Sequence, residues 1–163
     1  MTDPLLSPSR CQRILFCTDF SDSADAAFEF AVDAAIRRPG CTLVLLHVVH
    51  EVEAQFWKSY IYEIENVDDE ARRTLDRKMA DTYLARLPSG LAARVEFRVG
   101  PEATTILEFA AANRIDLIVI GRHGRSGVQA ALFGKVAERI VRKAPCPVLV
   151  VPLEYTSSPP SAT

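Results

Sequence analysis

The chain alternates between short continuous runs of branched apolar residues and longer stretches in which apolar residues recur at every third or fourth position. A continuous run bounded by turn residues is typical of a strand buried on both faces, and the three-to-four spacing is typical of an amphipathic helix. The runs predict buried strands over 13–18, 42–49, 117–120 and 148–152, and alternation predicts an outer strand over 93–99. The helical spacing predicts helices over 24–35, 67–87, 103–113 and 128–143, and leaves 50–66 unassigned.

Strands that alternate with helices in this way predict an α/β fold, in which helices cover both faces of a parallel sheet. We expect a doubly wound, three-layer arrangement with five strands in the order 3-2-1-4-5. In such sheets a ligand lies at the carboxyl ends of the strands, where the direction of winding reverses. The reversal falls between the first and fourth strands, so Asp19 and the glycine-rich segment after Ile120 should meet in one crevice.

Composition agrees with one globular unit. The chain has 163 residues, of which 48% are hydrophobic and 25% are charged. We place the domain at 13–152, after a flexible lead at 1–12 and before a disordered tail at 153–163.

The 19 basic and 21 acidic residues give a net charge of −2, which argues against a nucleic-acid partner. Without an apolar run near ~20 residues or a signal-peptide core, we expect no membrane insertion and a cytoplasmic location.

Four cysteines are present, and their spacing does not suggest a metal site. None forms a Cys-x-x-Cys motif, and no histidine stands beside them at the spacing of a zinc site. In a reducing compartment the expected state is a free thiol that fills a small space in the core or on the surface. We therefore predict four free thiols, at Cys11, Cys17, Cys41 and Cys146.

The segment 117–127 carries the candidate chemistry. Its apolar strand is followed by three glycines mixed with basic residues, and then by a helical pattern. Strand, glycine-rich turn and helix form a common anion-binding arrangement, because glycines let the backbone approach a ligand and a helix amino terminus adds partial positive charge. The spacing is not that of a Walker A loop, a dinucleotide-binding Gly-x-Gly-x-x-Gly or a Gly-x-Ser-x-Gly nucleophile elbow. We interpret the segment as a cradle for the phosphates of a nucleotide.

The glycine spacing also carries a family resemblance. Gly121, Gly124 and Gly134 are separated by two and nine residues, and 136–151 reads VAERIVRKAPCPVLVV. Together with LFCTDFS at 15–21 and LLHVV at 45–49, these blocks closely resemble the universal stress protein family over 12–152. The resemblance implies a five-stranded α/β fold that is often dimeric through its last strand. In one branch of the family it implies ATP bound by Gly-x₂-Gly-x₉-Gly-[Ser/Thr].

Carried over to this chain, the resemblance assigns Asp19 and Val48 to the adenine and ribose end of the nucleotide, and the three spaced glycines to its phosphates. The expected ligand is ATP, with or without Mg, and AMP and ADP are alternatives. The residues expected to contact the nucleotide are Thr18, Asp19, Val48, Ile120, Gly121, Arg122, His123, Gly124, Gly134, Lys135 and Val136.

Lys135 departs from the motif, which has Ser or Thr at this position. A hydrogen bond to a charged group is worth roughly 1.5–3 kcal/mol, so losing the hydroxyl would weaken binding roughly ten- to a hundredfold. An ammonium beside a phosphate would offset this loss, whereas a lysine turned into solvent would not. Two interpretations stay open: an ATP-binding regulatory protein of the stress response, and a nucleotide-free interaction or protective protein of the same fold.

The site residues also have structural interpretations. Gly121 and Gly124 would serve a tight turn, and Asp19 would cap the helix that follows it. Arg122 and Arg125 would be solvated surface charges. His123 is a candidate phosphate donor, yet no nucleophile or carboxylate partner is evident near it. We therefore expect no catalytic residue and a regulatory protein rather than an enzyme, with slow ATP hydrolysis as an open alternative.

An adenylating or pyrophosphatase-type enzyme of a related class is disfavoured. Such enzymes carry a Ser-Gly-Gly-x-Asp-Ser-like loop after the first strand, and residues 18–21 read TDFS instead.

The last strand predicts an assembly. Val148–Val151 lies at an edge of the expected sheet and carries no charge. A bare apolar edge invites aggregation, and pairing with the same strand of a second copy would cover it. We predict a homodimer through this strand, together with a protein partner whose identity the sequence does not indicate. Four aromatic residues within 56–62 would form a lid over the site or, as we favour, pack on the body or on a partner chain.

Overall fold

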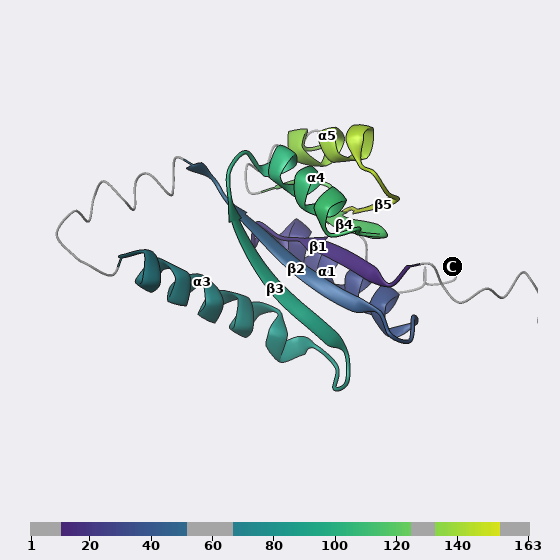
Figure 1. The fold of residues 1–163 in the computed structure, drawn as a ribbon, viewed down its shortest axis with the longest axis horizontal. Coiled ribbons are helices and arrows are strands. Elements are labelled where there is room, and N and C mark those ends of the chain that lie inside the picture. The colour runs from purple at the N-terminus through teal and green to yellow at the C-terminus, as the bar shows by residue number, and fades with distance from the viewer. Residues whose placement is uncertain (1–10, 52–66, 125–132, 154–163) are drawn as a thin grey trace, which may run out of the picture.

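Five parallel strands form one sheet in the order β3-β2-β1-β4-β5, which confirms the predicted fold class (Figure 1). The structure, a computed structural model, describes residues 11–51, 67–124 and 133–153. β1 pairs with β4, with Leu15 opposite Ile118, so the winding reverses between these two strands as expected. The strands span Arg13–Cys17 (β1), Thr42–Val49 (β2), Ala92–Val99 (β3), Leu117–Gly121 (β4) and Val148–Val151 (β5).

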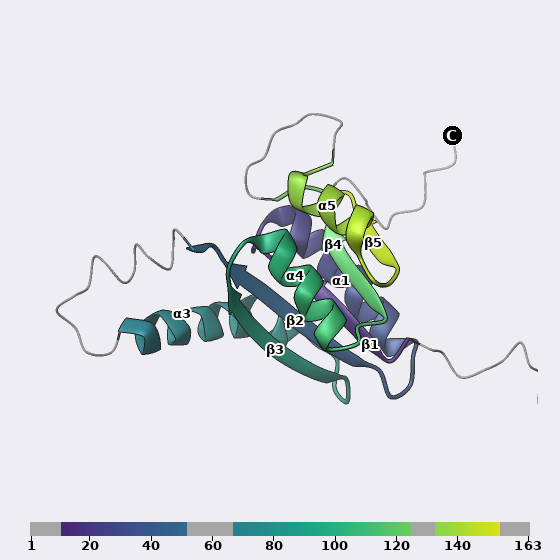
Figure 2. The same ribbon diagram turned by 45° about the horizontal axis from the view of Figure 1, so that its top comes forward.

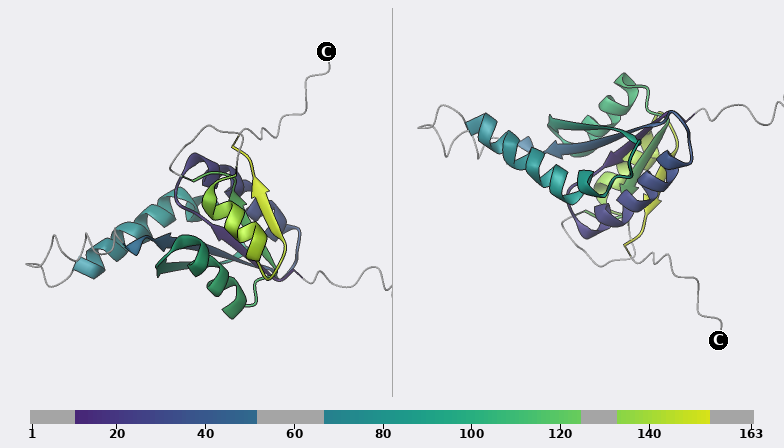
Figure 3. Two further views of the ribbon diagram at one scale, coloured as in Figure 1. Left: turned by 90° about the horizontal axis from the view of Figure 1, so that it is seen from above. Right: turned by 90° about the horizontal axis from the view of Figure 1, so that it is seen from below.

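Helices cover both faces of the sheet. The two panels of Figure 3 show α4 and α5 on one face and α1 and α3 on the other. Side chains of the central strand β1 alternate between two cores: Ile14 and Phe16 face α1 and α3, whereas Leu15 and Cys17 face α4 and α5. The helices span Asp22–Ile36 (α1), Val67–Thr82 (α3), Glu102–Ala112 (α4) and Lys135–Lys143 (α5).

The apolar spacing correctly predicted α1 and its buried face. Ser21 caps the helix, since its side chain accepts a hydrogen bond of 3.2 Å from the backbone N–H of Ala24. Asp22 and Asp25 place negative charge in the first turn, where the helix dipole favours it. The cap and the packing together hold the β1–α1 turn, residues 18–21, against the end of the sheet. The predicted inner face is confirmed at Ala24, Ala27, Phe28, Ala31 and Ala35.

The two edges of the sheet differ in charge. On β3, Glu96 forms ion pairs with Arg94 at 3.2 Å and with Arg98 at 2.8 Å. At the opposite edge, β5 consists of four apolar residues, and Leu149 is 36% exposed (Figure 2). Charged side chains discourage a strand edge from pairing with another chain. The β3 edge has this protection and the β5 edge does not.

The start of the last helix corrects the prediction. α5 begins at Lys135, not near residue 128, and Gly134 is its N-cap with an extended backbone (φ −60°, ψ 148°). Glycine is a poor helix former and takes extended conformations freely, so the helix starts only after it. Phe133 also lies outside the helix, and 125–132, which include Arg125, are not among the described residues.

The end of the helix predicted over 67–87 also needs correction. The helix predicted over 67–87 ends at Thr82 and is followed by a short 3₁₀ turn at Leu84–Arg86, because Tyr83 leaves the helical conformation. Along β3, Val95 and Phe97 pack against the core, whereas Val99 is 61% exposed because the core does not reach the end of this strand.

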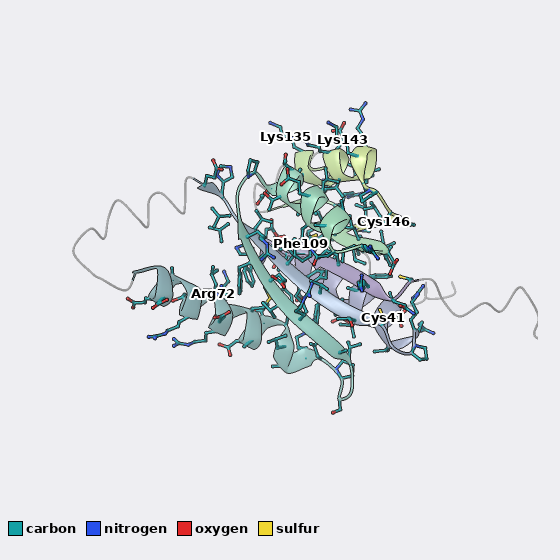
Figure 4. The ribbon with its side chains drawn as sticks, in the orientation of Figure 1. Cys41, Arg72, Phe109, Lys135, Lys143 and Cys146 are labelled. Atoms are coloured by element: carbon teal, nitrogen blue, oxygen red, sulfur yellow. The ribbon has the colours of Figure 1, made fainter. Side chains whose placement is uncertain are left out.

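The four cysteines are free thiols, as predicted. Burial raises the pKa of each of them, so they stay protonated at neutral pH. Figure 4 places Cys41 and Cys146 toward the end of the sheet where the strands begin. Within the described residues, no helix combines the length and the apolar character needed to cross a membrane. Apart from 11–12 and 153, the predicted lead and tail lie outside the described residues, as do the aromatic residues of 56–62.

Candidate functional site

The carboxyl ends of β1 and β4 meet at one place, as the strand order required. Cys17 lies opposite Ile120 in the register, so the β1–α1 turn and the segment 121–124 leave the sheet side by side. A Cβ atom built onto Gly124 would lie 2.8 Å from Oδ2 of Asp19. Two segments about a hundred residues apart in sequence are thereby in contact.

Asp19 supports the turn, and Ser21 rather than Asp19 caps α1. Oδ1 of Asp19 accepts a hydrogen bond of 3.0 Å from the backbone N–H of Ser21, and Oδ2 faces Gly124. The interpretation of Asp19 as the helix cap is therefore wrong. Its carboxylate lies at the boundary between the turn and the glycine segment, where it can accept hydrogen bonds from hydroxyl or amino groups.

Gly121 allows a close approach of β4 to α1. A Cβ atom at this position would lie 2.6 Å from the backbone oxygen of Ser23, closer than real Cβ atoms approach. Gly134 is less tight, since its Cβ would lie 3.1 Å from the backbone oxygen of Arg122. Neither these two glycines nor Gly124 adopts a left-handed φ. They are therefore suited to close packing of backbone segments rather than to an unusual turn conformation.

Backbone hydrogen bonds hold the glycine segment in place. The N–H of Arg122 donates to the carbonyl of Val151 at 2.8 Å, and the N–H of Gly134 donates to the carbonyl of Arg122 at 2.8 Å. The N–H of His123 donates to Oγ of Ser23 at 3.3 Å. Arg122 and His123 are half-buried, so Arg122 is not a fully solvated surface charge as the alternative interpretation had it.

The amino terminus of α5 adjoins this segment through Gly134. Glycine has no side chain to cap the N–H groups of the first turn, which leaves them suited to an anion. Lys135 is exposed, and in Figure 4 it lies on the outer side of α5, away from the sheet. Val136 is half-buried against the core shared by α4 and α5.

The remaining predicted contacts are mostly buried. Val48 and Ile120 are 6% and 9% exposed and belong to the α4–α5 core, so they underlie the site rather than line an open surface. Thr18 is 6% exposed, and its hydroxyl bonds within the protein. The residues that lie where the β1–α1 turn meets the glycine segment are thus Asp19, Arg122, His123, Gly124 and Gly134.

Ser23 was missed by the sequence analysis. It is 4% exposed, and it contacts both the backbone at Gly121 and the N–H of His123. The sequence places Ser23 in a run of helix-capping residue types, and no local pattern indicates a contact a hundred residues away.

Two groups at this place are suited to contacting a ligand. Backbone N–H groups at the start of α5 suit phosphate oxygens, and the carboxylate of Asp19 suits hydroxyl or amino groups. Among the residues that the structure describes, no group of three or more His, Cys, Asp and Glu side chains could hold a metal ion.

Comparison with known proteins supports the fold described above. Residues 11–152 match the model of the universal stress protein family. The universal stress protein MJ0531 of Methanocaldococcus jannaschii is 28% identical over 80% of this chain and 78% of its own length.

Solved structures have the same fold. MJ0577, a universal stress protein from the same organism, superposes with a TM-score of 0.69 and 26% identity, covering 91% of this chain and all of that one. A universal stress protein solved in complex with cAMP has a TM-score of 0.60 at 24% identity, covering 88% of this chain and 98% of that one. At this identity the second comparison shows the fold alone.

Proposed function

The chain belongs to the universal stress protein family, and on that premise we propose that it is an adenine-nucleotide-binding regulatory protein of the stress response. ATP is the ligand we expect, and AMP and ADP are alternatives. The nucleotide would bias an interaction with a protein partner. A related protein of this fold binds cAMP, so the fold can hold an adenine nucleotide.

The contact between Asp19 and Gly124 carries the proposal. A Cβ atom built onto Gly124 would lie 2.8 Å from Oδ2 of Asp19, so a carboxylate and a backbone without a side chain lie next to each other. We assign the carboxylate to the ribose hydroxyls or the adenine amine, both of which donate hydrogen bonds. We assign the backbone of Gly124 and the first turn of α5 to the phosphates, because N–H groups and the helix dipole favour negative charge there.

Regulation is favoured over fast catalysis. Among the described residues near Asp19 and Gly124, no group of three or more His, Cys, Asp and Glu side chains could hold a metal ion that activates water. Mg²⁺ would accompany ATP through the phosphates. Slow hydrolysis is tested by following ADP release during the binding experiment.

We also propose a homodimer through β5. The strand lies at the edge of the sheet, contains only Val and Leu, and leaves Leu149 partly exposed. Pairing with β5 of a second copy would bury this edge by a two-fold contact. Light scattering should give a dimer for the wild type and a monomer for Leu149→Lys. A wild-type monomer at the same concentration would exclude the dimer.

The identity of the ligand can be tested by calorimetry. Nucleotide-stripped wild type and Lys135→Ser are each titrated with ATP and Mg²⁺. Micromolar binding by the wild type, about 8 kcal/mol, would support the proposal, and the variant would then measure what Lys135 contributes. If only the variant binds, the fold keeps its cradle and Lys135 disables it. If neither binds ATP, AMP or ADP, the nucleotide proposal fails.

The second candidate is a nucleotide-free interaction or protective protein. One observation favours it: exposed Lys135 replaces the motif's hydroxyl and lies on the outer side of α5. In that case the protein would still be a dimer, but no calorimetric titration with an adenine nucleotide would show binding. Protein partners would then be the ligands to look for.

A further inference from the structure

Tyr83, at the end of α3, contacts the turn that carries Asp19. It is 0% exposed, and its hydroxyl lies 2.7 Å from Oγ1 of Thr18, a residue 65 positions earlier in the chain. A buried phenol hydroxyl requires a hydrogen-bond partner, and this one is supplied by the residue directly before Asp19. We propose that Tyr83 is a positioning residue for the nucleotide site, acting through Thr18 on the turn that presents Asp19. The inference rests on the proposed nucleotide function.

Thr18 is held by several hydrogen bonds at once. Its Oγ1 also accepts a hydrogen bond of 2.9 Å from the backbone N–H of Phe20, and this bond closes the turn around Asp19. Its backbone N–H donates to the carbonyl of Leu46 at 3.0 Å, and its carbonyl lies 2.8 Å from Nδ1 of His47. The Tyr83 hydroxyl is therefore bonded to the same oxygen that shapes the turn.

Phe20, the residue after Asp19, has a backbone conformation that needs support. Its φ is +61°, in the left-handed region that residues other than glycine rarely adopt. Such a conformation persists only when the surrounding structure holds it. The Phe20 ring stacks on Tyr83 at 5.9 Å between centroids and packs on His47 at 4.8 Å, and Nζ of Lys78 lies 4.4 Å from its centre.

Tyr83 thus contacts the residues on both sides of Asp19. Its hydroxyl binds Thr18 and its ring stacks on Phe20, so the direction of the intervening carboxylate depends on it. The remaining contacts of the ring, with Phe16 at 5.2 Å and Phe28 at 4.8 Å, are ordinary core packing. A substitution that removes only the hydroxyl therefore separates the role of Tyr83 in positioning the turn from its role in packing the core.

Tyr83→Phe removes the hydroxyl and keeps the ring. We expect it to weaken ATP binding about two- to tenfold by calorimetry, the range for one neutral hydrogen bond. The same substitution should have no further effect in an Asp19→Asn protein, because the residue that it positions is then already altered. Phe28→Leu is the control, since it loosens the packing around the same ring without contacting the turn. It should lower the unfolding temperature and leave the affinity unchanged.

A second measurement needs no nucleotide. Without the hydroxyl of Tyr83, the Phe20 amide should exchange its proton faster by NMR in Tyr83→Phe, while amides of β1 keep their rates. Unchanged Phe20 exchange would overturn the inference whether or not the protein binds nucleotide. Equal affinity losses in the wild-type and Asp19→Asn backgrounds, or in Phe28→Leu, would also overturn it. A wild type that binds no adenine nucleotide would instead remove the proposed function, and with it the role assigned to Tyr83 in binding.

Discussion

Two aspartates at opposite ends of the sheet show how one residue type serves different purposes. At the amino end, Oδ2 of Asp116 accepts hydrogen bonds of 2.9 Å from the backbone N–H groups of Gln12 and Arg13, and so fastens β1 to the start of β4. At the carboxyl end, Asp19 shapes its own turn through Oδ1 and directs Oδ2 toward Gly124. Asp116 joins strands within the fold, whereas Asp19 lies where two loops come together.

The difference follows from the direction of the chain. Parallel strands present their carboxyl ends at one edge of the sheet, where loops and helix amino termini gather. Asp19 follows a strand and Asp116 precedes one. We therefore expect nucleotide affinity to depend on the carboxyl end and stability to depend more on the amino end.

The largest effect should come from Gly124→Val. A valine side chain would begin 2.8 Å from Oδ2 of Asp19, so it must displace the carboxylate and also fill the approach to the phosphates. We expect ATP affinity to fall more than about a hundredfold, the loss of at least one strong charged hydrogen bond. Ala93→Val, at an exposed position of β3, is the control. Affinity within threefold of the wild type in Gly124→Val would remove the proposed site.

Asp19→Asn should have the next largest effect. The amide keeps an oxygen for the Ser21 N–H but loses the charge and one acceptor. We expect affinity to fall about ten- to a hundredfold while the unfolding temperature changes little. Calorimetry and thermal unfolding on the same sample separate the two. A large loss of stability with unchanged affinity would make Asp19 a structural residue like Asp116.

Asp116→Ala should give the opposite result. It leaves two backbone N–H groups without their carboxylate acceptor, which we expect to lower the free energy of unfolding by about 1–3 kcal/mol. Nucleotide affinity should match that of the wild type when measured well below the unfolding transition. Denaturant unfolding measures the first quantity. An Asp116→Ala protein with reduced affinity would show that the two ends are not independent.

The fold was accessible from the sequence because its signals are local. Uninterrupted apolar runs indicated the strands, and three-to-four spacing indicated α1. The alternation of strands with helices, together with the family resemblance, predicted the strand order. The start of α5 was not predicted, since apolar spacing continued across Gly134 while the glycine backbone took an extended conformation. Helix spacing describes a face and does not by itself locate an N-cap.

The site was less accessible because its contacts are long-range. The strand order brought Asp19 and Gly124 together, but it did not indicate that Gly121 packs against Ser23 or that Tyr83 bonds to Thr18. These pairs join residues 65 or more positions apart, and neither member carries a pattern that names its partner. Burial of Val48 and Ile120 likewise depends on α4 and α5, which pack on the same face of the sheet as these two side chains.

The smallest expected effect is a loss of stability at alkaline pH, caused by Cys41 at the amino end of the sheet. Burial raises the pKa of Cys41 above the ordinary thiol value of 9.0, so above that pH the unfolded chain releases a proton that the folded protein retains. The contribution of this thiol to the free energy of unfolding should therefore stay constant below pH 9.0 and decrease above it. The decrease is at most about 1.4 kcal/mol per pH unit for each such thiol. Cys41→Ala should reduce this slope without changing nucleotide affinity at neutral pH. Denaturant unfolding between pH 8 and 10 measures the slope, and equal slopes in the two proteins would show that Cys41 does not contribute to it.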